Sequence, residues 1–268
     1  MADEDSGEIQ LTENIDQAII EQVRDIEKQI AGAFPLVTEK ENIVVLGKDY
    51  SDDDKIYQAK LKDLYSRYTY LRKTRGDGNC FFRSYGFRTL EECLSNAETL
   101  NKFIEKSTNI KDSLIQIGYP AYTVEDFYEV VMDIVNIAKE NGTLDDIIQV
   151  FNDQGHSDYF VVFLRLMVSC YLQQNEAFYS AFIEGHTTMK DFCSQEVEPM
   201  AKESDHIHII ALTSVLETTV QVEYMDRGGD EEKVNYHRFP DDGTTPTIYL
   251  LYRPGHYDIL YPRDSSDT

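Results

Sequence analysis

Near residue 219 the sequence changes from helical patterns of apolar residues to short strand-like segments. The segments TVQVEYM, VNYHRF, PTIYLLYR and HYDILY are rich in β-branched and aromatic residues, which favour strands. They are separated by DRGGDEE, PDDGTTP and PG, whose glycines and prolines favour turns. Helices first and strands last predict an α+β fold, in which the C-terminal part of the chain forms a small, mostly antiparallel sheet.

An amphipathic segment lies close to the N-terminus. Between Leu11 and Gly32, apolar residues recur every three or four positions, as on one face of a helix: Ile15, Ile19, Val23, Ile26 and Ile30. Two interpretations remain open, since this helix either packs on the domain or forms a mobile arm that offers its apolar face to a partner protein. Residues 1–10 are acidic and polar, and we predict that they are disordered.

The centre of the chain shows successive helical patterns with short connections. We expect one helix from about Lys55 to Arg72 and another that begins in the segment FFRSYGFRTLEECL. Further helices are expected over residues 124–140, 144–152, 158–173, 175–184 and 188–196. No repeat or low-complexity linker divides these patterns. Residues 36–262 are therefore predicted to form one domain, preceded by an arm (1–35) and followed by a polar tail (263–268).

The strongly acidic composition limits the choice of partners. The 268 residues include 49 Asp and Glu against 25 Lys and Arg, a formal net charge of −24. Binding to nucleic acid or to an anionic membrane requires clustered basic residues, so both are disfavoured. No apolar run is long enough for a membrane-spanning helix, and the start MADEDSGEIQ resembles no signal or transit peptide. We expect a monomeric protein of the cytoplasm or the nucleus.

The four cysteines lack the close spacing of a zinc site. Three of them, Cys93, Cys170 and Cys193, lie in apolar helical segments, where a buried free thiol is the simplest interpretation. Cys80 instead ends a glycine turn. We therefore expect no metal ion and no cofactor, and we treat Cys80 separately from the other three.

Cys80 stands in the segment RGDGNCFFRS. If FFRSYGF begins a helix, the thiol lies at a helix N-terminus, where unpaired N–H groups and the helix dipole favour a thiolate. The same N–H groups could stabilise an oxyanion, and Gly76 and Gly78 allow the backbone to fold closely around the sulfur. The alternative is a buried cysteine that follows an ordinary turn, and the turn alone does not decide between the two.

A thiolate enzyme also needs a base, and His256 is the best candidate. It follows a Pro-Gly turn in LYRPGHYDILY, with Asp258 two residues later on the same face of the expected strand. Asp258 could then orient the imidazole, as the third group of a catalytic triad does. A His–Asp pair without a catalytic role is the alternative. If His256 is the base, activity should rise through its pKa, expected near about 6.5 or somewhat above.

The segment ESDHIHIIAL offers a competing site. In an extended chain, His206 and His208 could share a metal ion. The segment also has a helical pattern, however, and residues two apart on a helix point in different directions. A His-x-His metalloprotease pattern would further require a serine where Leu216 stands. We instead interpret Glu203 and Asp205 as acidic groups that meet a cationic side chain of a substrate.

Several motifs resemble one family of enzymes. DGNCFFR resembles the Asp-Gly-Asn-Cys-(Phe/Leu)-(Tyr/Phe)-Arg signature of the ovarian-tumour (OTU) cysteine deubiquitinases, and GHYDILY resembles their histidine motif. Longer stretches are similar to the otubains, most closely to the otubain-1 type: YLRKTRGDGNCFFR, FNDQGHSDYFVVFLRL, FCSQEVEPMAKESDHIHIIAL, QVEYMDRG and YLLYRPGHYDILY. The resemblance extends from about Lys55 to Tyr261.

The resemblance implies a papain-like OTU protease fold, with a helical subdomain and a small mixed sheet. It implies that Cys80 is the nucleophile, that His256 is its base and later the general acid, and that Asp258 orients His256. It also implies that a loop shapes the oxyanion hole, with the N–H groups of its first residue and of Cys80 as donors. The residues of this loop are Asp77, Gly78 and Asn79.

The resemblance further implies ubiquitin conjugates as substrates, with a preference for Lys48-linked chains that are cleaved at the isopeptide bond. One ubiquitin would lie on the catalytic domain with its Leu-Arg-Gly-Gly tail near Cys80, and the helical arm would grip the second. Members of the family also bind ubiquitin-conjugating enzymes and block them without using the thiol, which is the alternative function. The residues implied in substrate binding are Ile15, Ile19, Val23, Glu203, Asp205 and Tyr257.

Overall fold

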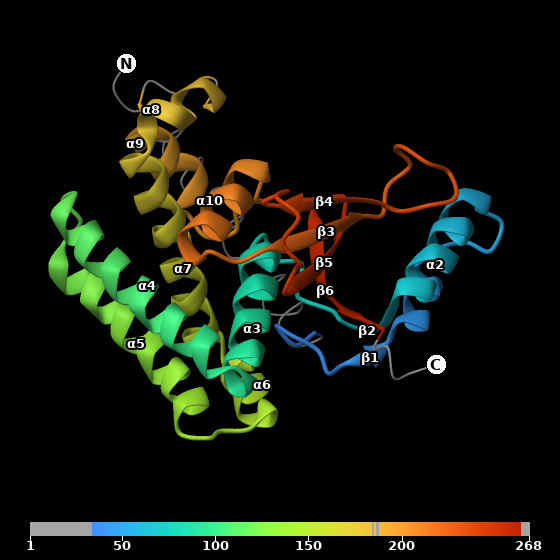
Figure 1. The fold of residues 1–268 in the computed structure, drawn as a ribbon, viewed down its shortest axis with the longest axis horizontal. Helices are drawn as coiled ribbons and strands as arrows, with labels where there is room; N and C mark the ends of the chain where they lie inside the picture. The colour runs from blue at the N-terminus through green and yellow to red at the C-terminus, as the bar shows by residue number, and fades with distance from the viewer. Residues whose placement is uncertain (1–33, 184, 186–187, 264–268) are drawn as a thin grey trace, which may run out of the picture.

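A six-stranded sheet in the order β1-β2-β6-β5-β3-β4 organises the computed structural model, which describes residues 34–183, 185 and 188–263 (Figure 1). The strands are β1 (Glu41–Asn42), β2 (Tyr68–Arg72), β3 (Val220–Tyr224), β4 (Asn235–Phe239), β5 (Ile248–Arg253) and β6 (His256–Pro262). Neighbouring strands are antiparallel except β3 and β5, which run parallel. The expected α+β fold with a mixed, mostly antiparallel sheet is confirmed.

Helices cover both faces of this sheet (Figure 1). The long helices are α2 (Lys55–Arg67), α3 (Cys80–Ser95), α4 (Ala97–Gln116), α5 (Ala121–Lys139), α6 (Leu144–Asn152), α7 (Gln154–Gln174) and α10 (His206–Leu216). Short helical turns are η1 (Ile43–Asp49), α8 (Glu176–Tyr179), η2 (Ser180–Phe182), α9 (Met189–Phe192) and η3 (Cys193–Val197). The larger hydrophobic core joins α3–α7 and α10 to one face, and a smaller one joins α2 and η1 to the other.

Helix α3 runs through the centre of the molecule and is buried on nearly all sides. Phe81 and Phe82 follow Cys80 directly and are almost fully buried, and the Phe81 ring packs edge-on against Tyr257 of β6 at 5.4 Å. Burial of each phenyl ring stabilises the fold by about 1.5–3 kcal/mol. The two rings therefore anchor the N-terminal end of α3, and with it Cys80, against the sheet.

The helix expected from Lys55 to Arg72 is only partly correct. Helix α2 ends at Arg67, and residues 68–72 form β2, which pairs with β6. The apolar spacing of the helix continues through Tyr68 and Leu71, so periodicity alone does not reveal its end. Pairing with β6 decides the outcome, because it satisfies the backbone groups of this segment and buries both side chains.

The other expected helices and strands are present with small shifts in their ends. Helix α6 matches its predicted range, and Thr143 and Asp146 form a capping box at its start. The four C-terminal segments are the strands β3–β6. Helix α4, in contrast, was not predicted as a separate element. Within the described ranges, no helix has the length and apolar character needed to cross a membrane.

Residues 1–33 of the predicted N-terminal arm and residues 264–268 of the polar tail lie outside the described residues. The same holds for three residues implied in substrate binding: Ile15, Ile19 and Val23. Their roles stay predictions.

Candidate active site

Cys80 is the first residue of α3, directly after a tight turn. Gly78 has a φ of +74°, in the left-handed region that side chains other than glycine rarely adopt. A Cβ atom at Gly78 would also lie 2.3 Å from the carbonyl oxygen of Ala201, so only glycine lets the two segments approach this closely. The turn thereby places the thiol at the N-terminal end of a helix, as the sequence predicts, where the helix dipole favours an anion.

His256 and Asp258 lie on one face of β6. His256 begins the strand after Gly255, whose φ is +75°. Its Nε2 atom lies 2.8 Å from Oδ1 of Asp258, so the period-two spacing brings the two side chains together as predicted. The other ring nitrogen, Nδ1, remains for Cys80, and a hydrogen bond between His256 and Cys80 contributes to the charge state of the imidazole. Thiol, imidazole and carboxylate thus form one connected row.

Asp258 is fully buried and is held from two further sides. The backbone N–H of Thr74 donates to Oδ1 at 3.0 Å, and the Arg253 guanidinium donates to Oδ2 at 2.6 Å. Burial opposes ionisation, but the hydrogen bonds and the charges of His256 and Arg253 outweigh it and lower the pKa of Asp258. Asp258 is therefore a fixed anion beside the imidazole.

The charge state of His256 differs from the expectation. Burial opposes the imidazolium, but hydrogen bonds to Asp258 and Cys80, and their negative charges, raise the pKa of His256 from 6.5 to about 9. The ring is thus protonated at neutral pH, beside the Cys80 sulfur. The pKa lies above 6.5, in the direction predicted for a histidine beside Asp258, but the shift is larger than expected, because Cys80 also acts on the ring.

We expect kcat/KM to fall as the pH rises through about 9, where His256 loses the proton that the leaving amine requires. Protonated His256 also stabilises the fold below about pH 6.5, and this contribution is lost as the pH rises through about 9. The test is a pH profile of hydrolysis from 6 to 11, with circular dichroism at each pH as a control for unfolding. A rate that stays constant between pH 8 and 10.5 would contradict this role of His256.

The oxyanion loop differs from the expectation in one donor. The N–H of Asp77 donates to the carbonyl oxygen of Arg75 at 3.1 Å, and the N–H of Asn79 donates to Oδ1 of Asp77 at 2.9 Å. Both groups are thus occupied. Among the described residues, none accepts a hydrogen bond from the N–H of Gly78 or of Cys80. In this conformation Gly78 and Cys80, rather than Asp77 and Cys80, are the available donors.

A slot of about 120 Å³ opens beside Cys80. Glu203, Asp205 and Tyr257 line it, so these three candidates for substrate binding lie next to the thiol. The slot is narrow and polar. Its other lining residues are Gly78, Phe81, Ser204, His206, Tyr224, Tyr252 and Gly255.

His206 and His208 do not face one site. His206 contacts the hydroxyl of Tyr224 through Nε2 at 3.0 Å, whereas Nδ1 of His208 accepts from the backbone N–H of Asp205 at 3.0 Å. Burial lowers the pKa of His208. The helical interpretation of this segment is thus confirmed. His208 accepts a backbone hydrogen bond at the N-terminal end of α10. Asp205 is the capping residue of this helix.

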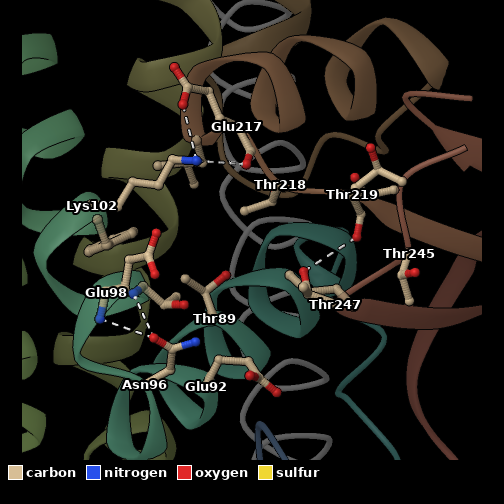
Figure 2. A pocket seen from close by; sticks show the side chains of 15 residues that line it. Thr89, Glu92, Asn96, Glu98, Lys102, Glu217, Thr218, Thr219, Thr245 and Thr247 are labelled. Atoms are coloured by element: carbon tan, nitrogen blue, oxygen red, sulfur yellow. Dashed lines mark hydrogen bonds and ion pairs between the residues drawn. The ribbon is translucent and has the colours of Figure 1, made fainter. Parts of the chain in front are cut away.

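A larger cavity of about 300 Å³ lies elsewhere, between α3, the start of α4 and the loops that precede β3 and β5 (Figure 2). Many threonines line it, and Lys102 at its edge donates to the carbonyl oxygen of Glu217 at 3.1 Å. It shares no lining residue with the slot at Cys80. Its size alone therefore does not connect it with the chemistry.

Three site residues were not found from the sequence. Thr74 and Arg253 hold Asp258, and Arg165 of α7 contacts the loop before Cys80. An arginine within an apolar helical pattern, as in FVVFLRLMV, is a signal that could have identified Arg165, because a buried cation needs a specific set of acceptors. Thr74 and Arg253 carry no comparable signal.

The papain-like fold and the row of thiol, imidazole and carboxylate define a cysteine peptidase. The family model Peptidase C65 Otubain matches residues 29–262. Ubiquitin thioesterase OTUB1 of Homo sapiens is 50% identical over 246 residues, which are 92% of this chain and 90% of that protein. Ubiquitin thioesterase OTUB2 of Homo sapiens is 38% identical over 232 residues, 87% of this chain and 97% of that protein.

A solved structure shares the same fold. The matching chain of the h/ceOTUB1–ubiquitin aldehyde–UBC13~Ub complex superposes with a TM-score of 0.88 at 34% identity, over 93% of this chain and 99% of that chain. The chain belongs to the otubain family.

Proposed function

We propose that this otubain is a deubiquitinating isopeptidase that hydrolyses the bond between two ubiquitins and prefers Lys48-linked chains. The observation that carries the proposal is the connected row of Cys80, His256 and Asp258 beside a narrow slot. Its relatives OTUB1 and OTUB2 are ubiquitin thioesterases. The linkage preference rests on the otubain resemblance.

In the first half of the reaction the Cys80 sulfur attacks the carbonyl carbon of the last glycine of ubiquitin. The N–H groups of Gly78 and Cys80 stabilise the resulting oxyanion. His256 then donates its proton to the lysine nitrogen, the C–N bond breaks, and a thioester remains on Cys80.

In the second half of the reaction water completes the hydrolysis. His256, now neutral, removes a proton from the water as its oxygen attacks the thioester carbonyl, and the C–S bond breaks. The products are the free carboxyl group of ubiquitin, which releases one proton to the solvent as it ionises, and the protonated imidazole beside the regenerated thiolate. Asp258 holds the ring in place through both halves.

The slot suits the C-terminal tail of ubiquitin. The two glycines of the tail have no side chains, so they fit beside Gly78 and Tyr257, while Glu203 and Asp205 offer carboxylates to the arginine that precedes them. The second ubiquitin is bound by the segment of residues 1–35, in which the otubain resemblance implies Ile15, Ile19 and Val23.

The test is a panel of diubiquitins of every linkage type, incubated with the full-length protein and analysed on gels. We expect the Lys48-linked dimer to be cleaved about tenfold faster than any other, a difference of about 1.4 kcal/mol in transition-state binding. Equal cleavage of all linkages would contradict the preference. No cleavage by a demonstrably folded protein would contradict the isopeptidase itself.

A second candidate function is binding and inhibition of ubiquitin-conjugating enzymes without catalysis. The observation that favours it is the likeness to OTUB1 in complex with UBC13~Ub. In a chain-synthesis assay, Cys80→Ala should then still inhibit, whereas a chain without residues 1–33 should not. Loss of inhibition in Cys80→Ala would count against this function.

A further inference from the structure

Arg165 of α7 is buried beneath the slot at Cys80 and joins its two walls. Its Nη2 atom donates to the carbonyl oxygen of Gly78 at 3.1 Å and to Oδ1 of Asn79 at 3.0 Å, on the wall that carries Cys80. The same atom donates to the carbonyl oxygen of Lys202 at 2.8 Å, and Nη1 donates to that of Val197 at 3.0 Å, both in the segment that leads to Glu203 on the opposite wall. One guanidinium thus links the two segments that lead to the walls of the slot.

The two walls also touch each other directly. The N–H of Ala201 donates to Oδ1 of Asn79 at 2.9 Å, so this amide oxygen accepts from both Ala201 and Arg165. The absence of a side chain at Gly78 allows the backbone contact with Ala201. Arg165 lies next to this contact, and its guanidinium also packs on the face of the Phe82 ring, 4.5 Å from the ring centroid.

Arg165 fixes the orientation of the peptide group between Gly78 and Asn79. Its carbonyl oxygen points to Arg165, and its N–H points to Oδ1 of Asp77. A rotation of this peptide would turn a carbonyl oxygen, which is an acceptor, toward the site where negative charge develops during acyl transfer. The contact with Arg165 prevents this rotation and keeps the acceptor away from the oxyanion.

The guanidinium has an unusual set of partners. Among the described residues, only neutral oxygens accept its hydrogen bonds, and no carboxylate forms an ion pair with it. Burial lowers the pKa of Arg165 to about 10, against the charges of Asp77 and Cys80. A buried cation without a paired anion is costly, and groups of this kind are concentrated at functional sites.

We propose that Arg165 is a positioning residue for acyl transfer, which holds the two walls of the slot so that the N–H groups of Gly78 and Cys80 meet the oxyanion. The inference rests on the proposed isopeptidase function. Arg165 itself does not contact the substrate. Loss of Arg165 should therefore slow the steps that form an oxyanion, but it should have little effect on reactions of the Cys80 thiol in which no oxyanion forms.

Arg165→Lys tests the proposal, because lysine keeps the positive charge but cannot span acceptors on both walls. We expect kcat for a ubiquitin C-terminal amide substrate to fall by about tenfold to hundredfold, as a displacement near 1 Å does elsewhere. KM should change by less than about threefold, because ubiquitin binds over a wide surface. Alkylation of Cys80 by iodoacetamide, followed by mass spectrometry, should keep its wild-type rate, since it forms no oxyanion.

Arg72→Lys is the matched control. Arg72 is another buried arginine, on β2, and it donates to Tyr261 and to the carbonyl oxygen of Thr38, away from the slot. The Arg72→Lys variant should leave the ratio of the acyl-transfer rate to the alkylation rate unchanged. If Arg165→Lys does not fold, Asn79→Ser decides, because it removes the shared amide oxygen and leaves the guanidinium in place. It should lower kcat in the same selective way.

The proposal is overturned if Arg165→Lys, or Asn79→Ser in its place, retains the wild-type kcat. It is also overturned if kcat and alkylation fall together. If the wild type itself cleaves no ubiquitin substrate, the isopeptidase proposal fails instead, so the two failures are distinguishable.

Discussion

Cys80→Ala should lower the hydrolysis of Lys48-linked diubiquitin by at least about 10⁴-fold, to the limit of detection on a gel. The Cys80 sulfur beside His256 forms the covalent intermediate, and the methyl group of alanine cannot replace it. The helix N-terminus and the loop before it should remain, since Cys80 is a small side chain and Phe81 and Phe82 anchor α3. Binding of ubiquitin should therefore persist while turnover is lost.

Cys93→Ala is the matched control for this experiment. Cys93 lies on the same helix and is buried, but burial raises the pKa of its thiol to about 12, so it is not a thiolate at neutral pH. The change should cost about 1 kcal/mol of stability, as in typical core substitutions, and leave kcat unchanged. Equal rates of wild type and Cys80→Ala, in protein shown to be folded, would refute the assignment of Cys80.

The catalytic row was predictable from the sequence because each part depends on local geometry. Cys80 follows a glycine turn at the start of a helix, and His256 and Asp258 are two residues apart on a strand. Turn, helix start and strand alternation are all properties of a few neighbouring residues. The long otubain-like stretches then connected the two distant segments.

The residues that hold the catalytic row in place were not predictable, because they come from elements far apart in the sequence. Thr74 lies beside Asp258 because β2 pairs with β6, whereas the sequence pattern predicts the end of a helix where β2 forms. Arg165 reaches the loop before Cys80 from the middle of α7. Tertiary pairing decides such contacts, and local propensity does not.

The sequence also does not predict which N–H groups of the turn are free, and the N–H of Asp77 is an example. The sequence DGN indicates a tight turn, but the turn can present its donors in more than one direction. The hydrogen bonds to Arg75 within the turn, and from Arg83 to Asp77 at 2.6 Å, select the direction that the structure shows. Because Arg83 lies on α3, the donor set of the oxyanion hole depends on how the helix packs, which the motif does not encode.

Asp258→Asn should lower kcat/KM by about 10²–10⁴-fold, a range whose upper end matches the same change in a serine protease. The carboxylate accepts from His256 and Thr74 on one oxygen and from Arg253 on the other. An amide has one acceptor and one donor group, so its NH₂ must face either Arg253 or the pair of His256 and Thr74. If the NH₂ group faces Arg253, two donor groups face each other. If it faces His256 and Thr74, it donates to the imidazole and holds the ring in the wrong tautomer.

The same variant should move the alkaline limb of the pH profile to lower pH. Loss of the Asp258 charge removes a principal cause of the raised pKa of His256, so the imidazolium should lose its proton below pH 9. Both effects are measured with a fluorogenic ubiquitin C-terminal substrate between pH 6 and 10.

Asp49→Asn is the matched control for Asp258→Asn. It removes a carboxylate that also binds Arg253, but it leaves Asp258 in place to orient the imidazole. Asp49 accepts from Arg253 at 2.9 Å and from Lys73 at 3.1 Å, but it does not touch His256. As a partly exposed ion pair it is worth at most about 1 kcal/mol, and its loss should change kcat/KM by less than about fivefold. If Asp49→Asn and Asp258→Asn reduce activity equally, or if Asp258→Asn keeps the wild-type pH profile, then Asp258 does not act through His256.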